Sequence, residues 1–211
     1  MPSTRDQRPY NVRYYQRNRQ REIDRVTSRQ RATIEFLRDL RRIPCKECGG
    51  RLEPHQMDFD HRDPSTNSFQ VTDSRLRSRE RLLAEIAKCD IVCANCHAIR
   101  TYALQAQRKA QRRANGTISM SPRRVRQWTT EAHRRDLLLS LRDRPCIDCG
   151  HRFPPFIMQF DHRDPVSKKF LVCGTLLSSV ARILGEAAKC DIVCPNCHRD
   201  RTLRQRLAGV L

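Results

Sequence analysis

The chain has 211 residues, and its 42 Lys and Arg residues outnumber its 23 Asp and Glu residues, so its formal net charge is +19. Most of the basic residues are arginines, whose planar side chains match phosphate geometry, so we expect a polyanionic partner such as a nucleic acid. A ribosomal or nonspecifically adhesive basic protein would have a similar charge. No apolar run is long enough to span a membrane, and residues 1–6 lack the apolar segment of a signal peptide, so we expect a cytoplasmic protein.

An internal repeat divides the chain into two similar halves. Residues 45–101 recur as residues 146–202 without a gap, and more than half of the aligned positions are identical. A repeated unit normally folds as a structural unit of its own, so we predict two tandem modules. The predicted parts are a basic N-terminal helical arm over 1–42, module 1 over 43–113, a linker over 114–121, a basic connecting helix over 122–144 and module 2 over 145–211.

A basic helix is predicted before each module. Apolar residues recur at helical spacing between Asn11 and Arg42, and Pro44 ends that helix because proline lacks an N–H and disfavours helix in the residue before it. Ser121 followed by Pro122 is typical of a helix start. We predict that the second helix runs from there to Asp143, either unbroken or with a break near Thr129.

Between its two cysteine pairs, each module is predicted to form a hairpin and then a helix. In module 1, residues 56–60 alternate polar and apolar as a half-buried strand does, and residues 69–71 are the predicted returning strand. Ser78 is the predicted N-cap of a helix that ends near Lys88. The second cysteine pair then opens a helix predicted to continue through Arg113. These elements predict an α+β fold.

Each module contains two Cys-x2-Cys pairs. Four thiolates in two such turns are typical of a tetrahedral zinc site, which has no open position for water and is therefore structural. Disulfides or an iron–sulfur cluster are the alternatives. One zinc ion per module would stabilise a core too small to be stable alone. The predicted ligands are Cys45, Cys48, Cys93 and Cys96 in module 1 and Cys146, Cys149, Cys194 and Cys197 in module 2, whereas Cys89 and Cys190 are predicted to be small buried residues.

Each module also contains an adjacent Asp-His pair and a later His. One carboxylate and one imidazole, completed by water and phosphate oxygens, suit Mg²⁺ or Mn²⁺, and the remaining imidazole suits a general base at neutral pH. A single Asp-His pair is more often a helix cap or a surface ion pair. Its retention in both copies, while neighbouring positions differ, favours a site. The residues are Asp60, His61 and His97 in module 1 and Asp161, His162 and His198 in module 2.

The combined pattern resembles the HNH endonucleases, which have a ββα-metal fold. Cys-x2-Cys is followed by Phe-Asp-His-Arg-Asp-Pro and then by Lys-Cys-Asp-Ile-Val-Cys-x-Asn-Cys-His, and this order is similar to that of a small bacterial and phage branch of the family. The resemblance implies hydrolysis of DNA phosphodiester bonds, with the helix after the second cysteine pair near the minor groove. It also implies that His61 and His162 are the general bases, and that Asp60 with His97 and Asp161 with His198 hold one catalytic Mg²⁺ or Mn²⁺ per module.

The chain departs from the family pattern at one position. The middle Asn of the family usually lies about five residues before the third cysteine, and this chain has Lys88 there in module 1 and Lys189 in module 2. In many members that Asn orients the loop of the base His, so the positioning of His61 has no explanation in the sequence. Asn95 and Asn196 lie inside the second cysteine pair instead.

The expected partner is DNA, with RNA as the alternative nucleic acid, and no membrane. We expect a monomer that acts as a pseudo-dimer, in which each module nicks one strand or one module cuts while the other binds. The main alternative function is a non-catalytic zinc-binding adaptor for nucleic acid, and a third is a regulatory protein that binds another nuclease. The predicted nucleic-acid contacts are Arg62, Arg100, Arg108, Lys109, Arg112, Arg113, Arg163 and Arg201.

Overall fold

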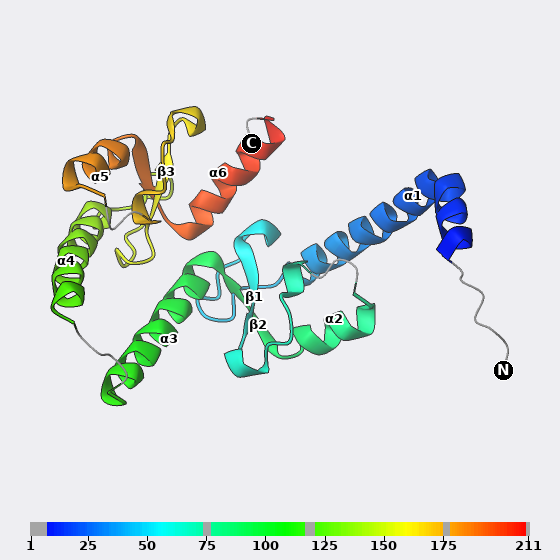
Figure 1. Ribbon diagram of the computed structural model, residues 1–211, viewed down its shortest axis with the longest axis horizontal. Helices are drawn as coiled ribbons and strands as arrows, with labels where there is room; N and C mark the ends of the chain where they lie inside the picture. The colour runs from blue at the N-terminus through cyan, green and yellow to red at the C-terminus, as the bar shows by residue number, and fades with distance from the viewer. Residues whose placement is uncertain (1–7, 74–76, 117–120, 175–177, 210–211) are drawn as a thin grey trace.

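The chain has an α+β fold, as predicted, with a small two-stranded antiparallel sheet and flanking helices in each of two similar regions (Figure 1). The predicted linker over 114–121 lies partly outside the part of the chain that the structure describes. The structure is a computed structural model, and it describes residues 8–73, 77–116, 121–174 and 178–209.

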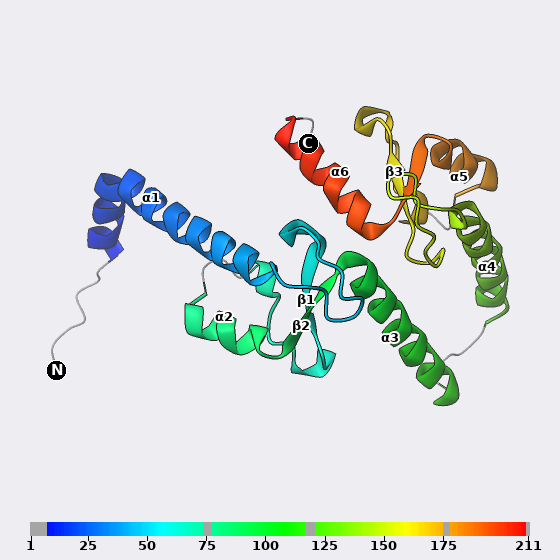
Figure 2. The same cartoon turned by 180° about the vertical axis from the view of Figure 1, so that it is seen from behind.

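Two long helices confirm the basic helical segments. α1 (Arg8–Leu40) begins slightly before the predicted start at Asn11, and α4 (Pro122–Arg142) begins at the predicted proline. Leu37, near the C-terminal end of α1, is buried, whereas Ile23 on the same helix is exposed. The N-terminal part of α1 extends away from the first module in both views (Figure 1, Figure 2).

The strand pairing differs from the predicted hairpin. β1 (Met57–His61) pairs antiparallel with β2 (Cys89–Cys93), and β3 (Gln159–His162) pairs in the same way with β4 (Cys190–Val193). The predicted returning strand over 69–71 is therefore wrong. That segment is short and leads into a single 3-10 turn, whereas β2 is rich in β-branched residues, which favour strands. The pairing aligns Met57 with Cys93 and so brings the two cysteine pairs of the module together.

A short amphipathic helix follows the loop in each module. α2 (Arg79–Ile86) and α5 (Val180–Ala187) occupy equivalent places. The predicted N-cap is confirmed, because the Ser78 hydroxyl accepts a hydrogen bond from the backbone N–H of Arg81. α2 ends just before the predicted Lys88. Leu82 on its inner face is fully buried.

Replacing Leu82 with alanine is expected to destabilise the zinc-loaded protein by about 2–5 kcal/mol, because a buried leucine loses its contacts and leaves a cavity. The adjacent Leu83 is the matched control, since its side chain is 45% exposed. Leu83→Ala should cost much less. Urea unfolding followed by circular dichroism measures both, and equal losses of stability would contradict the burial of Leu82.

The helix that follows the second cysteine pair has the first cysteine of that pair as its N-cap in each module. α3 (Ala94–Ala114) is capped at its C-terminus by Asn115, which confirms the predicted end of this helix, and α6 (Pro195–Leu207) is its shorter counterpart. Cys93 and Cys194 are their N-cap residues. In the described part of the chain, no helix combines the length and the apolar character needed to cross a membrane.

The two modules meet where α3 and α6 begin (Figure 1, Figure 2). The backbone N–H of Asn95 donates to Oδ1 of Asn196 at 3.2 Å, and the backbone N–H of Asn196 donates to Oδ1 of Asn95 at 3.0 Å. Each buried asparagine thus satisfies a free backbone donor in the first turn of the other module's helix. Because the two residues are equivalent in the repeat, the contact has an approximate two-fold axis, as in a symmetric dimer.

Candidate functional site

The eight predicted zinc ligands form two clusters. In each cluster, the four cysteine Sγ atoms all lie within 4.8 Å of one another. Thiolates on a tetrahedral zinc, at about 2.3 Å from the metal, lie about 3.8 Å apart, so a small contraction lets each cluster hold one zinc ion. The clusters comprise Cys45, Cys48, Cys93 and Cys96 in module 1 and Cys146, Cys149, Cys194 and Cys197 in module 2.

The backbone around each cluster favours bound thiolates. The N–H of Cys93 donates to Sγ of Cys45 at 3.2 Å, and the positive φ of 69° at Gly49 permits the tight turn directly after Cys48, where the N–H of Gly49 donates to the carbonyl of Cys45. Burial raises the pKa of the Cys45 thiol, but backbone N–H groups of Cys48, Cys93 and Glu47 outweigh it and lower that pKa to about 7. Zinc binds the thiolate form, so this environment favours binding.

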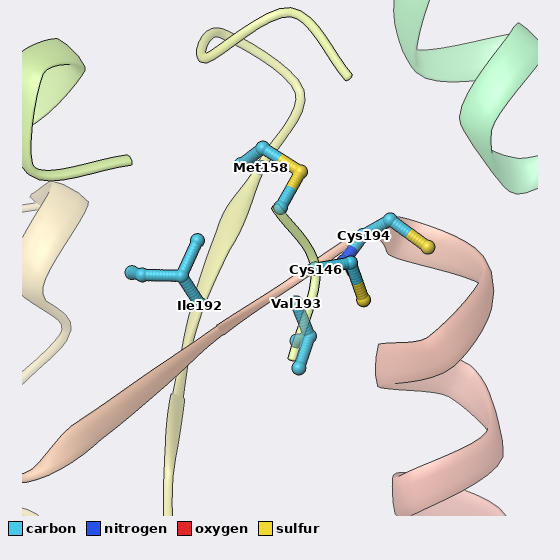
Figure 3. Packing of buried hydrophobic residues seen from close by; sticks show 5 residues of the cluster. All are labelled: Cys146, Met158, Ile192, Val193 and Cys194. Carbon is cyan, nitrogen blue, oxygen red and sulfur yellow. The ribbon is translucent and has the colours of Figure 1, made fainter. Parts of the chain in front are cut away.

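The cluster of module 2 lies at the edge of a small apolar core. Cys146 and Cys194 pack with Met158, Ile192 and Val193, and Figure 3 shows Cys194 at the start of the helix α6 with the side chain of Cys146 beside it. All five residues are buried. The cysteine cluster and the core are therefore parts of the same structural unit.

Cys89 and its repeat equivalent Cys190 lie outside the two clusters and are buried, as predicted. Sγ of Cys89 donates to the carbonyl of Glu85 at 3.4 Å. Burial first, and then the negative charges of Glu85 and Asp60, raise the pKa of Cys89 to about 11. Cys190 has the same surroundings and also a pKa of about 11. These thiols stay protonated and act as small packing groups.

The structure brings the predicted Asp and the later His together in both modules. The Nε2 atom of His97 lies 3.6 Å from Oδ1 of Asp60, and the equivalent distance from His198 to Asp161 is 3.3 Å. Adjacent ligands of an octahedral Mg²⁺ lie about 3.0 Å apart, so either pair can share one cation. Among the described residues, only the cysteine clusters group three or more potential ligands. Water and phosphate oxygens would therefore have to complete the coordination of such a cation.

The other predicted histidine points toward the short helix of its module, α2 in module 1 and α5 in module 2. Nε2 of His61 lies 2.8 Å from Oε1 of Glu85, because neighbouring residues of a strand face opposite sides. His61 nevertheless lines the same open pocket of about 370 Å³ as Asp60. In module 2, the residues Asp161, His162 and His198 all line one pocket of about 500 Å³.

A lysine–glutamate pair supports the loop around His61. Nζ of Lys88 donates to Oε2 of Glu85 at 2.8 Å and to the carbonyl of Thr66 at 3.0 Å, and the N–H of Ser68 donates to Oε1 of Glu85 at 2.8 Å. The hydrogen bond from Lys88, and then the one from Ser68, lower the pKa of Glu85 to about 2. Lys88 therefore connects the loop at Thr66 to Glu85, the hydrogen-bond partner of His61. It occupies the position at which the HNH pattern that this sequence resembles has Asn.

Glu85 and Asp90 lie beside the candidate site residues His61 and Asp60, and the sequence pattern alone did not single them out. Both recur in module 2, as Glu186 and Asp191, and this repetition was the available signal. Asp90 is the direct cross-strand neighbour of Asp60. Two neighbouring carboxylates repel each other unless a positive group lies between them. The correct strand pairing, which places Asp60 beside Asp90, would therefore have indicated a basic partner for them.

The predicted nucleic-acid contacts divide into two groups. Arg100 donates to Asp60 and to Asp90, each at 3.0 Å, and Arg62 donates to the carbonyl of Cys89 at 2.9 Å. These arginines and their counterparts Arg163 and Arg201 are bound to groups around the site. The other predicted contacts lie on the exposed C-terminal part of α3, and these are Arg108, Lys109, Arg112 and Arg113.

The environment of the later His differs between the modules. Nδ1 of His97 lies 2.8 Å from Oδ2 of Asp58, which raises the pKa of His97. Burial raises the pKa of Asp58, but His97 and then Arg199 outweigh it, so that pKa falls below its usual value. Module 2 has Gln159 in place of Asp58, and the buried Oε1 of Gln159 has no hydrogen-bond partner among the described residues.

No protein-family model, curated protein or solved structure matches the chain significantly. Support for a function therefore comes from the geometry of the two modules and from the sequence pattern.

Proposed function

We propose that this chain is a metal-dependent endonuclease of the HNH type, with one phosphodiester-hydrolysing site in each module. One observation carries the proposal. In both modules an aspartate oxygen and a histidine Nε2 face each other at 3.3–3.6 Å, and the preceding strand places a second histidine beside that aspartate in one pocket. Such a repeated combination of cation ligands and a candidate base is typical of metal-assisted hydrolysis.

Each group in the site has a role in this chemistry. Asp60 and His97 would hold the cation, which, when bound, polarises the phosphate and stabilises the leaving oxygen. Glu85 accepts a hydrogen bond from Nε2 of His61, so the neutral ring keeps Nδ1 free to accept a proton from water. A buried carboxylate in this position also stabilises the protonated imidazole that forms.

Nucleic acid as the substrate is supported by charge and by its distribution. The formal net charge is +19, and the exposed C-terminal end of α3 carries four basic residues on the same helix that carries His97 near its start. Binding through phosphate contacts weakens as salt rises, because bound counterions are released. DNA is the substrate that we propose, with RNA as the competing substrate in the same assay.

A specific observation favours the non-catalytic adaptor as the second candidate. In module 1, Arg100 bridges Asp60 and Asp90, and Glu85 pairs with His61. The equivalent ion pairs are present in module 2, so the candidate site residues of both modules also belong to a network of ion pairs. In an adaptor these pairs would be purely structural. The two functions differ in whether the site needs a divalent cation.

The test is cleavage of supercoiled plasmid by zinc-loaded protein, with and without added Mg²⁺ or Mn²⁺. The wild type should cut only with the added cation. The double variant Asp60→Asn, Asp161→Asn should bind the same DNA but lose cleavage, because both candidate cation sites lose a carboxylate. DNA binding by the wild type without cleavage in either cation would reject the nuclease and favour the adaptor. A single-stranded RNA of the same length tests the alternative substrate.

A further inference from the structure

The interface between the modules is symmetric only at its centre. The paired asparagines obey the approximate two-fold axis, but the contacts on either side of them differ. On one side, His55 of module 1 lies 2.7 Å from Asp200 of module 2. On the other side, the rings of Tyr102 and Phe156 stack with their centroids 3.8 Å apart. One side of the interface is therefore polar and charged, and the other is aromatic.

The polar side reaches a candidate cation ligand of module 1. Arg199 of module 2 donates from Nη1 to Oδ1 of Asp58 at 2.9 Å and from Nη2 to Oδ2 at 2.6 Å. Oδ2 of the same carboxylate lies 2.8 Å from Nδ1 of His97. A bidentate arginine fixes the plane of a carboxylate, and this carboxylate fixes the ring of His97 with Nε2 toward Asp60.

Module 2 has no counterpart of this arrangement. The residues equivalent to Asp58 and Arg199 are Gln159 and Ala98, neither of which carries a charge. His97, His198, Arg199 and Gln159 line one pocket of about 360 Å³ between the modules, so the difference lies where the two candidate sites approach each other.

We propose that Arg199 and Asp58 form a clamp between the modules that positions His97 for cation binding. The two sites are then unequal, because only the site of module 1 depends on contact with the other module. This inference rests on the proposed function. Arg199 touches neither the cation nor the substrate, and it acts through Asp58. Partners that orient a metal-bound histidine typically contribute about 10- to 100-fold to metal affinity.

The experiment measures Mn²⁺ binding to the zinc-loaded full chain by calorimetry and by the electron paramagnetic resonance signal of free Mn²⁺. Asp161→Asn with His198→Ala leaves module 1 as the binding site, and Asp60→Asn with His97→Ala leaves module 2. Zinc content and circular dichroism verify folding in each background. In the module 1 background, Arg199→Gln should weaken Mn²⁺ binding by about tenfold or more. Asp58→Asn should weaken it at least as much, and the double variant should lose nothing further because Arg199 acts through Asp58.

Arg204→Gln is the matched control, because it removes the same charge from the same helix while its side chain is 77% exposed and contacts Asp200 rather than Asp58. It should leave Mn²⁺ binding unchanged, and so should Arg199→Gln in the module 2 background. Equal Mn²⁺ affinity with and without Arg199 in module 1 would reject the clamp while the nuclease function stands. Failure of both modules to bind Mn²⁺, together with no plasmid cleavage, would reject the proposed function and this inference with it.

Discussion

Removal of zinc unfolds both modules, and this is the largest effect that we expect. Module 1 has two buried core clusters, and the one beside the candidate zinc site consists of Cys45, Met57, Val92 and Cys93, so half of that cluster is made of candidate metal ligands. Structural zinc sites contribute roughly 10–16 kcal/mol of apparent binding free energy in small peptides, which exceeds what so small a core supplies. Extracting the metal therefore removes the main stabilising interaction of each module.

Single cysteine substitutions test the loss of zinc in one module at a time. Cys93→Ser should release one zinc ion and unfold module 1, and Cys194→Ser should do the same to module 2, with metal analysis and limited proteolysis as the measurements. Cys173→Ser is the control, since that exposed thiol lies outside both clusters. Retention of two zinc ions and of protease resistance in Cys93→Ser would contradict the metal assignment.

The second large effect concerns the two candidate general bases. His61→Ala and His162→Ala should each leave one working module, so that linear product disappears and nicked plasmid accumulates. The double variant should cleave about 10²- to 10⁴-fold more slowly than the wild type, which is the usual contribution of a general base. Product analysis on agarose gels, at constant salt and saturating Mg²⁺, measures both quantities.

The control for these variants is His133→Ala, because that histidine is exposed on α4 and is not among the residues that line the pockets of the two candidate sites. It should cut like the wild type. Linear product from the double variant at the wild-type rate would remove His61 and His162 from the mechanism. Loss of cleavage in only one of the single variants would show that one module cuts while the other binds.

Short sequence motifs predicted the starts and ends of helices, which depend on residues close together in the chain. Ser78 caps α2, Asn115 ends α3 and Pro122 begins α4, because turn and cap preferences act over a few residues. The two cysteine clusters were also predictable, since their spacing is regular and repeats without a gap.

Strand pairing was not predictable in the same way. The partner of β1 is β2, and the residues between them form a loop and a helix. The sequence favoured the nearer segment over 69–71 because its pattern is compatible with a strand. The tertiary structure selected β2 because this pairing closes the cysteine cluster and buries Met57 and Val92.

By itself, the sequence determined the repeat, the cysteine pairs, the basic helices and the candidate Asp and His residues, all of which are visible as residue types at fixed spacing. The tertiary structure alone decided which groups surround them. Glu85 reaches His61 from 24 residues away, and Arg199 reaches Asp58 from 141 residues away. Such contacts depend on how separate elements pack, and side-chain chemistry at one position carries no information about the partner that packing brings to it.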